Sequence, residues 1–423
     1  MLKKVDFWLL SFVFILFLVF SYFRSPAIFK YSFDDKLVSD YFRSQDIEDK
    51  EDKIKDRIFL SDSEIYLATG YLYAKGEDPT KFNFQHPPLV KYIFGFATLF
   101  FGNPYWVQIF FALFLIFLTY LLGKTAFKKR EVAFLASLFL VFDPLLKDNI
   151  TQLLLDPAQA VFSLFYIILA LYFPGNFLLN GVVLGLLFAS KFWSSSLLLV
   201  VFIFLYRKFL IKEKVDYKNM FLSFLVAFFT FSLTYIKTFI NYGGLFNIFL
   251  FELKMLKFML SHNTTSIFGN NLLLFFSGHF VSWWEKGRIL KADVWDFLWP
   301  LGFVFGILQI KNVKRLEKKD FIFIFPIFYF LINIFNAPFS RYFLIILPFI
   351  YLSLGSFINS KLKSQKLKLE TRTKNIEQRT KNKGKNYPPA KAIALAIAGR
   401  QIPSSKLHIQ IPNYKSQTTR NKF

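Results

Sequence analysis

Residues 61–92, SDSEIYLATGYLYAKGEDPTKFNFQHPPLVKY, form a polar stretch in a chain that is otherwise strongly apolar. Ser61 is followed three residues later by Glu64, a capping-box pattern that predicts a helix beginning at Asp62. Gly76 marks the C-terminal end of this helix, because glycine accepts the left-handed backbone that follows many helices. The stretch therefore predicts a short polar helix and then a loop.

Asp62 is a candidate general base on this predicted helix. Asp62 and Tyr66 share one face, whereas apolar residues recur at helical spacing on another. A carboxylate in the first turn feels the positive end of the helix dipole, so it stays ionised and is ready to accept a proton from a hydroxyl group. The alternative is that Asp62 only stabilises the start of the helix.

The QHPPLVK segment ends the loop with two prolines. Proline breaks helices and keeps the preceding backbone extended, so His86 and Lys91 are presented at fixed positions where the chain returns to the membrane. A cation there suits a phosphate that arrives from the lipid. A solvated interfacial histidine is the alternative. Residues 89–102 are too few to cross a bilayer, which predicts an interfacial or re-entrant helix.

The composition of the whole chain indicates a membrane protein. Its 423 residues are 54% hydrophobic and include 61 Phe, 20 Tyr and 7 Trp, far more than a soluble core of this size requires. No small-residue cleavage site follows the first apolar run, so this run predicts a retained anchor instead of a signal peptide. The chain has no cysteine, which excludes disulfides, thiolate metal sites and cysteine nucleophiles.

The apolar runs predict an all-α polytopic membrane protein with about ten transmembrane helices. Basic short loops stay cytoplasmic, so the N-terminus and the C-terminal tail lie inside and the loop 24–103 lies outside. The runs 177–190 and 192–206 are short for two spans, and one broken pass is the alternative. The ten runs lie near residues 7–23, 104–122, 131–146, 157–173, 177–190, 192–206, 219–240, 294–310, 320–336 and 341–358.

Most of the formal net charge of +24 belongs to the C-terminal tail. Residues 359–423 contain 16 Lys and Arg against 2 acids and few large apolar side chains. Such a segment is unable to bury a core, which predicts a disordered cytoplasmic tail near anionic lipid. RNA binding is the alternative, although we expect no nucleic-acid partner. The transmembrane domain then comprises residues 1–358.

Ionisable residues at membrane depth are costly unless they are paired or line a wet cavity. Asp156 precedes a proline at the start of a run, Lys191 interrupts an apolar hairpin, and Arg341 begins the last run. Lysine and arginine suit a lipid phosphate. A helix cap for Asp156, a headgroup contact for Lys191 and interfacial anchoring for Arg341 are the alternatives. Residues 278–288, GHFVSWWEKGR, fit either an aromatic belt or sugar stacking.

These motifs together resemble the membrane glycosyltransferases of the GT-C superfamily, especially the dolichyl-phosphate-mannose protein mannosyltransferases and the aminoarabinose transferases. In those families the first external loop carries an Asp-Glu pair, often as D-E-x-x-Y, followed by (H/K)-P-P-L. Asp62 and Tyr66 keep the D-x-x-x-Y spacing, and HPPL begins at His86. Ser63 stands where the family usually has glutamate, and Glu64 is displaced by one position.

The resemblance, over roughly residues 1–358, implies a GT-C-like fold with juxtamembrane helices in the first external loop. It implies an inverting glycosyltransferase of the plasma membrane, with Asp62 as the base at the external face. The donor would be a polyprenyl-phosphate sugar among membrane lipids, and the acceptor a glycan, lipid or protein. The residues expected to bind substrate are Glu64, Tyr66, His86, Lys91, Asp156, Lys191 and Arg341.

Two alternatives remain open at this point. The same intramembrane cations fit a transporter or flippase of a lipid-linked or small polar solute, although neither internal symmetry nor broken helices at mid-membrane are evident. Asp34 or Asp35 offers a different base, and with Asp156 these acids are compatible with a divalent metal. Nothing in their spacing demands a metal or any other cofactor.

Overall fold

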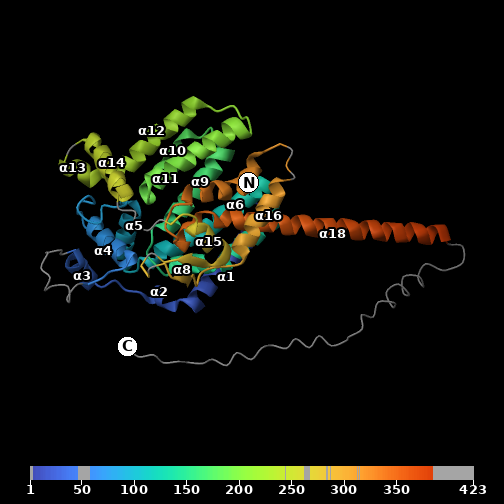
Figure 1. Cartoon of the computed structure of the whole chain (residues 1–423), viewed down its shortest axis with the longest axis horizontal. Helices are drawn as coiled ribbons and strands as arrows, with labels where there is room; N and C mark the ends of the chain where they lie inside the picture. The colour runs from blue at the N-terminus through green and yellow to red at the C-terminus, as the bar shows by residue number, and fades with distance from the viewer. Residues whose placement is uncertain are drawn as a thin grey trace, which may run out of the picture. The chain divides into compact units, whose positions relative to one another are not determined.

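The computed structural model describes residues 3–45, 58–242, 244–261, 267–282, 284–285, 287–311, 313 and 315–383. Within these ranges the regular structure is almost entirely helical (Figure 1). The α-helices are α1 (Lys4–Arg24), α2 (Pro26–Lys30), α3 (Lys36–Gln45), α4 (Asp62–Ala74), α5 (Leu89–Phe101), α6 (Tyr105–Phe127), α7 (Arg130–Phe142), α8 (Pro144–Ile150), α9 (Asp156–Tyr172), α10 (Phe177–Ser190), α11 (Trp193–Leu205), α12 (Tyr217–Leu233), α13 (Ile236–Tyr242), α14 (Leu245–Ser261), α15 (Asn270–Ser277), α16 (Leu298–Ile310), α17 (Phe321–Asn333) and α18 (Leu347–Lys383).

In the part of the chain that the structure describes, three helices are long and apolar enough to cross a membrane by length and composition. They are α1, α6 and the stretch Trp193–Leu210, in which α11 continues into the π-helical turn η2 (Tyr206–Leu210). The helices α5, α9, α10, α12 and α16 are apolar but shorter. Most of the bundle is therefore built from apolar helices, while the count of ten crossings and their orientation stay predictions.

The helix that begins at Asp62 is confirmed, with its predicted caps. The Ser61 hydroxyl accepts a hydrogen bond from the Glu64 N–H, and the Glu64 carboxylate accepts one from the Ser61 N–H. Gly76 takes a positive φ of 98°, and its N–H donates to the Tyr73 carbonyl. This pattern is a Schellman C-cap, which satisfies carbonyls at the end of α4.

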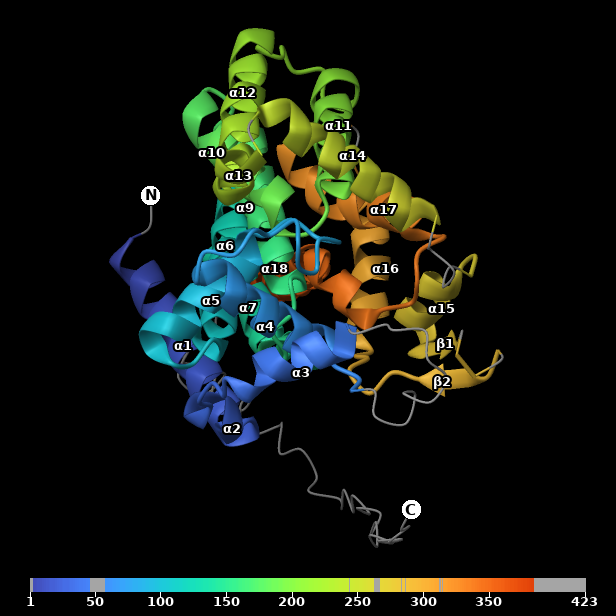
Figure 2. The same cartoon turned by 90° about the vertical axis from the view of Figure 1, so that its left-hand side faces the viewer.

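Helices α4 and α5 lie side by side at very close range (Figure 2). A Cβ atom placed on Gly70 would lie 2.2 Å from the Lys91 carbonyl oxygen, and one on Gly95 would lie 1.9 Å from the Gly70 carbonyl oxygen. Only glycine permits this contact between two backbones. The pair fixes α4, and with it Asp62, against the helix that follows the His-Pro-Pro segment.

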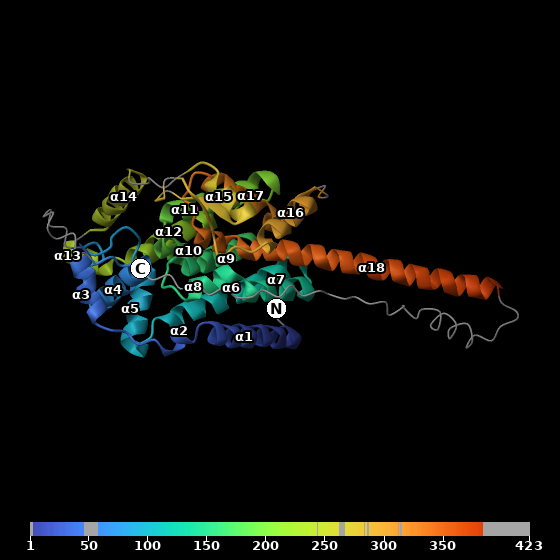
Figure 3. The same ribbon diagram turned by 60° about the horizontal axis from the view of Figure 1, so that its bottom comes forward.

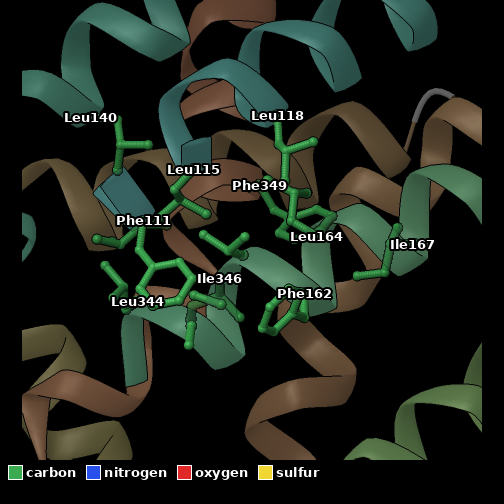
Figure 4. Close-up of a cluster of buried hydrophobic side chains, with 14 of the residues drawn as sticks. Phe111, Leu115, Leu118, Leu140, Phe162, Leu164, Ile167, Leu344, Ile346 and Phe349 are labelled. Atoms are coloured by element: carbon green, nitrogen blue, oxygen red, sulfur yellow. The ribbon is translucent and has the colours of Figure 1, made fainter. Parts of the chain in front are cut away.

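Helix α6 passes through the centre of the core and packs against α9 and the start of α18. Phe111 and Leu115 of α6 face Phe162 of α9 and Ile346 and Phe349 near the start of α18 (Figure 4). All five side chains are buried. This core joins the N-terminal third of the chain to its last apolar helix, which places η4 (Ser340–Ile345) directly before the core.

Helix α1 lies beside α6 and α7 (Figure 3). Asp6 in its first turn is fully buried and accepts a hydrogen bond of 2.7 Å from the Tyr120 hydroxyl. Lys124 and Arg130 also pair with Asp6, and the Arg130 Nε lies 3.4 Å from its Oδ1. Three polar groups from α6 and α7 thus hold α1 as part of the bundle.

One expectation about secondary structure needs correction. Residues 359–383, expected to be disordered, continue α18 as a helix up to Lys383, with exposed side chains from Ser360 to Lys374. The segment is rich in Lys, Leu, Gln and Arg, which favour helices. It contains no glycine, and Gly384 is the first residue after it. The rest of the predicted tail, 384–423, lies outside the described residues. The chain falls into two units, Met1–Lys361 and Leu362–Phe423, close to the predicted boundary.

The helical class is confirmed, with one addition that the sequence did not indicate. Residues 279–291 contain a small antiparallel hairpin of β1 (His279–Val281) and β2 (Ile289–Lys291), with His279 opposite Lys291. Gly278 directly precedes β1, and Gly287 lies in the connection between β1 and β2. Both glycines have a positive φ. The strand residues are mostly aromatic or aliphatic, which suits a β-ladder. Three-residue strands give too short an alternation to be recognised from sequence.

Candidate active site

The first turns of α4 and α9 meet through a polar anchor. The Ser63 hydroxyl accepts a hydrogen bond of 2.7 Å from the Leu153 N–H. The Gln108 side chain of α6 donates to the carbonyls of Gln152 and Leu154, both at 2.8 Å. These bonds fix the segment that leads into α9. Ser63, the departure from the family pattern, therefore ties α4 to the segment that carries Asp156.

Four of the predicted site residues form one chain of ion pairs. An Arg341 Nη2 atom lies 3.0 Å from Asp62 Oδ2, and the Arg341 Nε lies 3.8 Å from Asp156 Oδ2. Lys191 Nζ lies 2.5 Å from Asp156 Oδ1. We call Asp62, Arg341, Asp156 and Lys191 the charge cluster. It combines two carboxylates and two cations, so its formal charge is zero.

Lys191 reaches the cluster because the backbone leaves the helix at that point. Helix α10 ends at Ser190 and α11 begins at Trp193, and Lys191 has a non-helical φ of −152° and ψ of −70°. Its Nζ lies 4.7 Å from the centre of the Tyr342 ring. A cation over an aromatic face is stabilised by the ring quadrupole. Tyr342 therefore helps to hold Lys191 in place.

Arg341 is presented by the short 3-10 helix η4 and not by a regular span. Its guanidinium lies 4.6 Å from the centre of the Phe339 ring. The Tyr329 hydroxyl of α17 donates a hydrogen bond of 2.6 Å to the Tyr342 carbonyl, which anchors η4. The aromatic residues Phe339, Tyr342 and Tyr329 were not found from sequence. Nothing in their sequence context distinguishes these three residues from the other Phe and Tyr of the chain, which has 61 Phe and 20 Tyr in all.

His86 and Tyr66 lie next to the cluster, on the α4 side. The His86 ring centre is 5.8 Å from that of Tyr66 and 4.7 Å from that of Phe192. Burial lowers the pKa of His86 well below its ordinary value, and the nearby positive charges of Lys91, Lys191 and Arg341 act in the same direction. The imidazole is therefore neutral, and its buried Nδ1 has no hydrogen-bond partner.

Lys91 lies outside the charge cluster. Its side chain is fully buried, and Nζ donates hydrogen bonds to the carbonyls of Asn83 at 2.5 Å and His86 at 3.1 Å. The amine thus closes the loop that precedes the two prolines. Sequence spacing does not reveal this, because it does not show which carbonyls turn towards the amine.

Three other predicted acids lie apart from the charge cluster. The exposed Glu64 carboxylate accepts hydrogen bonds from the Ser61 N–H and hydroxyl, both at 2.7 Å. Asp34 and Asp35 are exposed, and Asp34 Oδ1 accepts from the Lys36 N–H at the start of α3. Among the described residues, no three His, Asp or Glu side chains gather closely enough to hold a metal ion.

A cavity of about 860 Å³ opens beside the cluster. Lys191, Gln159, Tyr342 and the serines of the first α11 turn supply its polar wall. Most of the remaining wall is apolar and comes from α11, α14 and α17, with Leu198, Leu199, Leu256, Met259, Phe325 and Phe328 among the lining residues. The cavity is therefore suited to an amphiphile with an anionic group near Lys191 and a long apolar chain.

Residues 278–288, for which the sequence suggested an aromatic belt or sugar stacking, form part of the β-hairpin. His279 is exposed, and Arg288 pairs with Glu285 at 2.9 Å. The Phe280 and Trp284 rings lie 6.0 Å apart. Trp283 and Lys286 lie outside the described residues, so a sugar-stacking role for this loop stays a prediction.

Two solved structures of ArnT from Cupriavidus metallidurans have the fold of this chain. The apo structure matches with a TM-score of 0.53 and 14% identity over 71% of this chain and 56% of ArnT. The structure bound to undecaprenyl phosphate matches with a TM-score of 0.53 and 15% identity over 76% of this chain and 58% of ArnT. No protein-family model and no curated protein matches the sequence.

The predicted resemblance is confirmed at the level of the fold. Sequence identity of this order shows a shared architecture, and the chain spans little more than half of the ArnT length. The apolar helices and this fold together make the chain an integral membrane protein. A shared fold does not determine the reaction, which depends on the residues of the site.

Proposed function

We propose that the protein is an inverting glycosyltransferase that moves a sugar from a polyprenyl-phosphate carrier to an acceptor at the external face of the plasma membrane. The observation that carries the proposal is the charge cluster beside a cavity of about 860 Å³ with largely apolar walls. The ArnT fold, seen in one structure with undecaprenyl phosphate, supports the same class of donor. The acceptor is a glycan, a lipid or a protein.

The donor phosphate would bind between Lys191 and Arg341. Lys191 already lines the cavity, and Arg341 pairs with the same aspartate, Asp156. The first turn of α11 adds the positive end of a helix dipole and backbone N–H groups, which favour a phosphate. The prenyl chain would follow the apolar wall formed by α11, α14 and α17, where it removes apolar surface from water.

Asp62 would act as the general base. Its carboxylate accepts the proton of an acceptor hydroxyl while that oxygen attacks the anomeric carbon of the sugar. The bond between the anomeric carbon and the phosphate oxygen breaks, and its electron pair leaves with the polyprenyl phosphate. Lys191 and Arg341 stabilise the negative charge that develops on this leaving group. Attack from the face opposite the phosphate inverts the anomeric configuration.

The proposal is tested with purified protein in lipid nanodiscs and radiolabelled sugars linked to polyprenyl phosphate. We expect Asp62→Asn to lower transfer by about 10²- to 10⁴-fold, because a general base contributes this much. Glu77→Gln is the matched control: it removes one negative charge from an exposed position just after α4 and leaves the capping box intact.

Two outcomes contradict the proposal. One is near-normal transfer by Asp62→Asn, which removes Asp62 as the base. The other is movement of the intact carrier-linked sugar across the bilayer without cleavage of the sugar–phosphate bond, which supports a transporter.

A further inference from the structure

In this structure Asp62, the proposed base, already forms an ion pair with Arg341. The Arg341 guanidinium pairs with Asp62 at 3.0 Å and also faces Asp156 at 3.8 Å. Lys191, the second cation, pairs with Asp156 at 2.5 Å. Every charge of the cluster is therefore balanced by another member. A phosphate that enters this site has to take a cation from one of the two carboxylates.

The burial of the two close pairs decides which of them opens. The side chains of Lys191 and Asp156 are 5% and 6% exposed, whereas those of Arg341 and Asp62 are 22% and 48% exposed. Breaking a buried pair leaves a charge without water or a counter-ion, which is strongly unfavourable. A half-exposed pair contributes little, because water replaces the lost partner. We therefore expect the Arg341–Asp62 ion pair to break when a phosphate binds.

Aspartate and phosphate bind the same fork of a guanidinium. Both present two oxygens to parallel N–H groups, so they are competing ligands for one Arg341 side chain. Arg341 lies on the short helix η4 and needs only a change of side-chain conformation to exchange partners. Once released, the Asp62 carboxylate is free to accept a proton from an acceptor hydroxyl.

We propose that Asp62 and the donor phosphate compete for Arg341, so that binding of the donor frees the base. This inference rests on the proposed function. Without a donor, Arg341 pairs with Asp62 and keeps its carboxylate from taking a proton from water or from an acceptor hydroxyl when no sugar is present to be transferred. With a donor, Arg341 turns to the phosphate and Asp62 becomes available. The donor therefore binds before the acceptor is activated.

The same exchange assists release of the product. After transfer, the acceptor proton is on Asp62 and the polyprenyl phosphate keeps the bonding electron pair. Asp62 is half exposed, so the proton passes to water and restores the carboxylate. This carboxylate then draws Arg341 away from the phosphate. One arginine thus alternates between two anions in each catalytic cycle.

The test measures binding of undecaprenyl phosphate, which carries no sugar and does not react, to the full-length protein in nanodiscs. Asp62→Asn removes the competing carboxylate, so we expect binding about two- to fivefold tighter than in the wild type, as loss of a partly exposed ion pair allows. The control Glu77→Gln removes an equal charge from an exposed position just after α4, and we expect it to leave the affinity for undecaprenyl phosphate unchanged. Asp62→Asn keeps the Ser61–Glu64 capping box, so α4 retains its start.

A double-mutant cycle shows whether the effect passes through Arg341. In an Arg341→Gln background, Asp62→Asn should give no more gain in affinity than Glu77→Gln. An equal gain in both backgrounds would indicate general repulsion of the anion and overturn the inference. Unchanged affinity of Asp62→Asn in the wild-type background overturns it as well. If the wild type itself binds no undecaprenyl phosphate, the proposed function fails instead.

Discussion

At the scale of single residues, Lys191 and Asp156 form a nearly dry ion pair. Replacing Lys191 by Met leaves the Asp156 charge buried, which typically costs about 3–5 kcal/mol of unfolding free energy. Arg341 lies 3.8 Å away and offsets part of this loss. We therefore expect a marked fall in the thermal midpoint, and partial recovery when Asp156→Asn is added. A larger loss in the double variant than in Lys191→Met would contradict the pairing.

The buried His86 side chain should make the protein less stable as the pH is lowered. Its pKa is well below the ordinary value in the folded protein, so the unfolded chain takes up a proton first as the pH falls below about 6.5. The free energy of unfolding then decreases by up to about 1.4 kcal/mol per pH unit. His86→Asn should flatten this decrease between about pH 7 and pH 5, as measured by denaturation in detergent. His279→Asn, at an exposed position on β1, is the control.

The residues of the charge cluster were found from sequence in two ways. Asp156, Lys191 and Arg341 are ionisable groups in or next to apolar segments, where an unpaired charge is costly. Asp62 was found from its place in the first turn of a predicted polar helix. The chain of contacts among these four residues was not predictable, because it depends on where η4 and the break after α10 come together. Lys91 satisfied the first of these criteria, yet it binds two loop carbonyls.

At the scale of elements, the contact between α4 and α5 depends on two glycines. Gly70→Ala or Gly95→Ala introduces a methyl group where backbone atoms lie 2.2 Å and 1.9 Å from the new carbon. The helices must separate, which typically costs about 1–3 kcal/mol and moves Asp62. Transfer should fall together with the thermal midpoint. Gly175→Ala, which meets no atom within 4 Å, should leave both unchanged.

Helix α14 forms part of the cavity wall and is tied down by Glu252. This buried carboxylate accepts hydrogen bonds from the Trp193 indole, at 3.0 Å, and from the Tyr235 hydroxyl. Glu252→Leu leaves both donors unpaired, so we expect weaker binding of undecaprenyl phosphate and a higher KM for the donor, with kcat at saturation nearly unchanged. Lys254→Gln on the exposed face of α14 is the control. A fall in kcat alone would assign Glu252 to the chemistry instead.

Helix boundaries were predictable where a cap residue marks them. The box at Ser61 and the glycine at Gly76 placed α4 correctly, and Gly102 ends α5 as the short run 89–102 implied. The extension of α18 was missed, because composition indicates whether a segment buries a core and not whether it continues an existing helix. The β-hairpin was missed because each strand has only three residues.

At the scale of the whole molecule, the charge cluster lies within the unit Met1–Lys361. A chain ended after Lys361 should therefore keep its helical circular dichroism spectrum and its transfer activity. It should lose binding to vesicles that contain anionic lipid, because it lacks most of the basic tail. Sedimentation with such vesicles at low and high salt measures the difference. Loss of transfer in the shortened chain would show that the tail contributes to the site.

The pairing of Asp62 with Arg341 joins residues that are 279 positions apart. At about 5–20 residues per second, a ribosome needs roughly 15 to 60 s to make the intervening chain. For all of that time Asp62 has been synthesised and Arg341 has not. An interrupted or prematurely ended translation product thus carries the Asp62 carboxylate without Arg341 and holds no complete charge cluster.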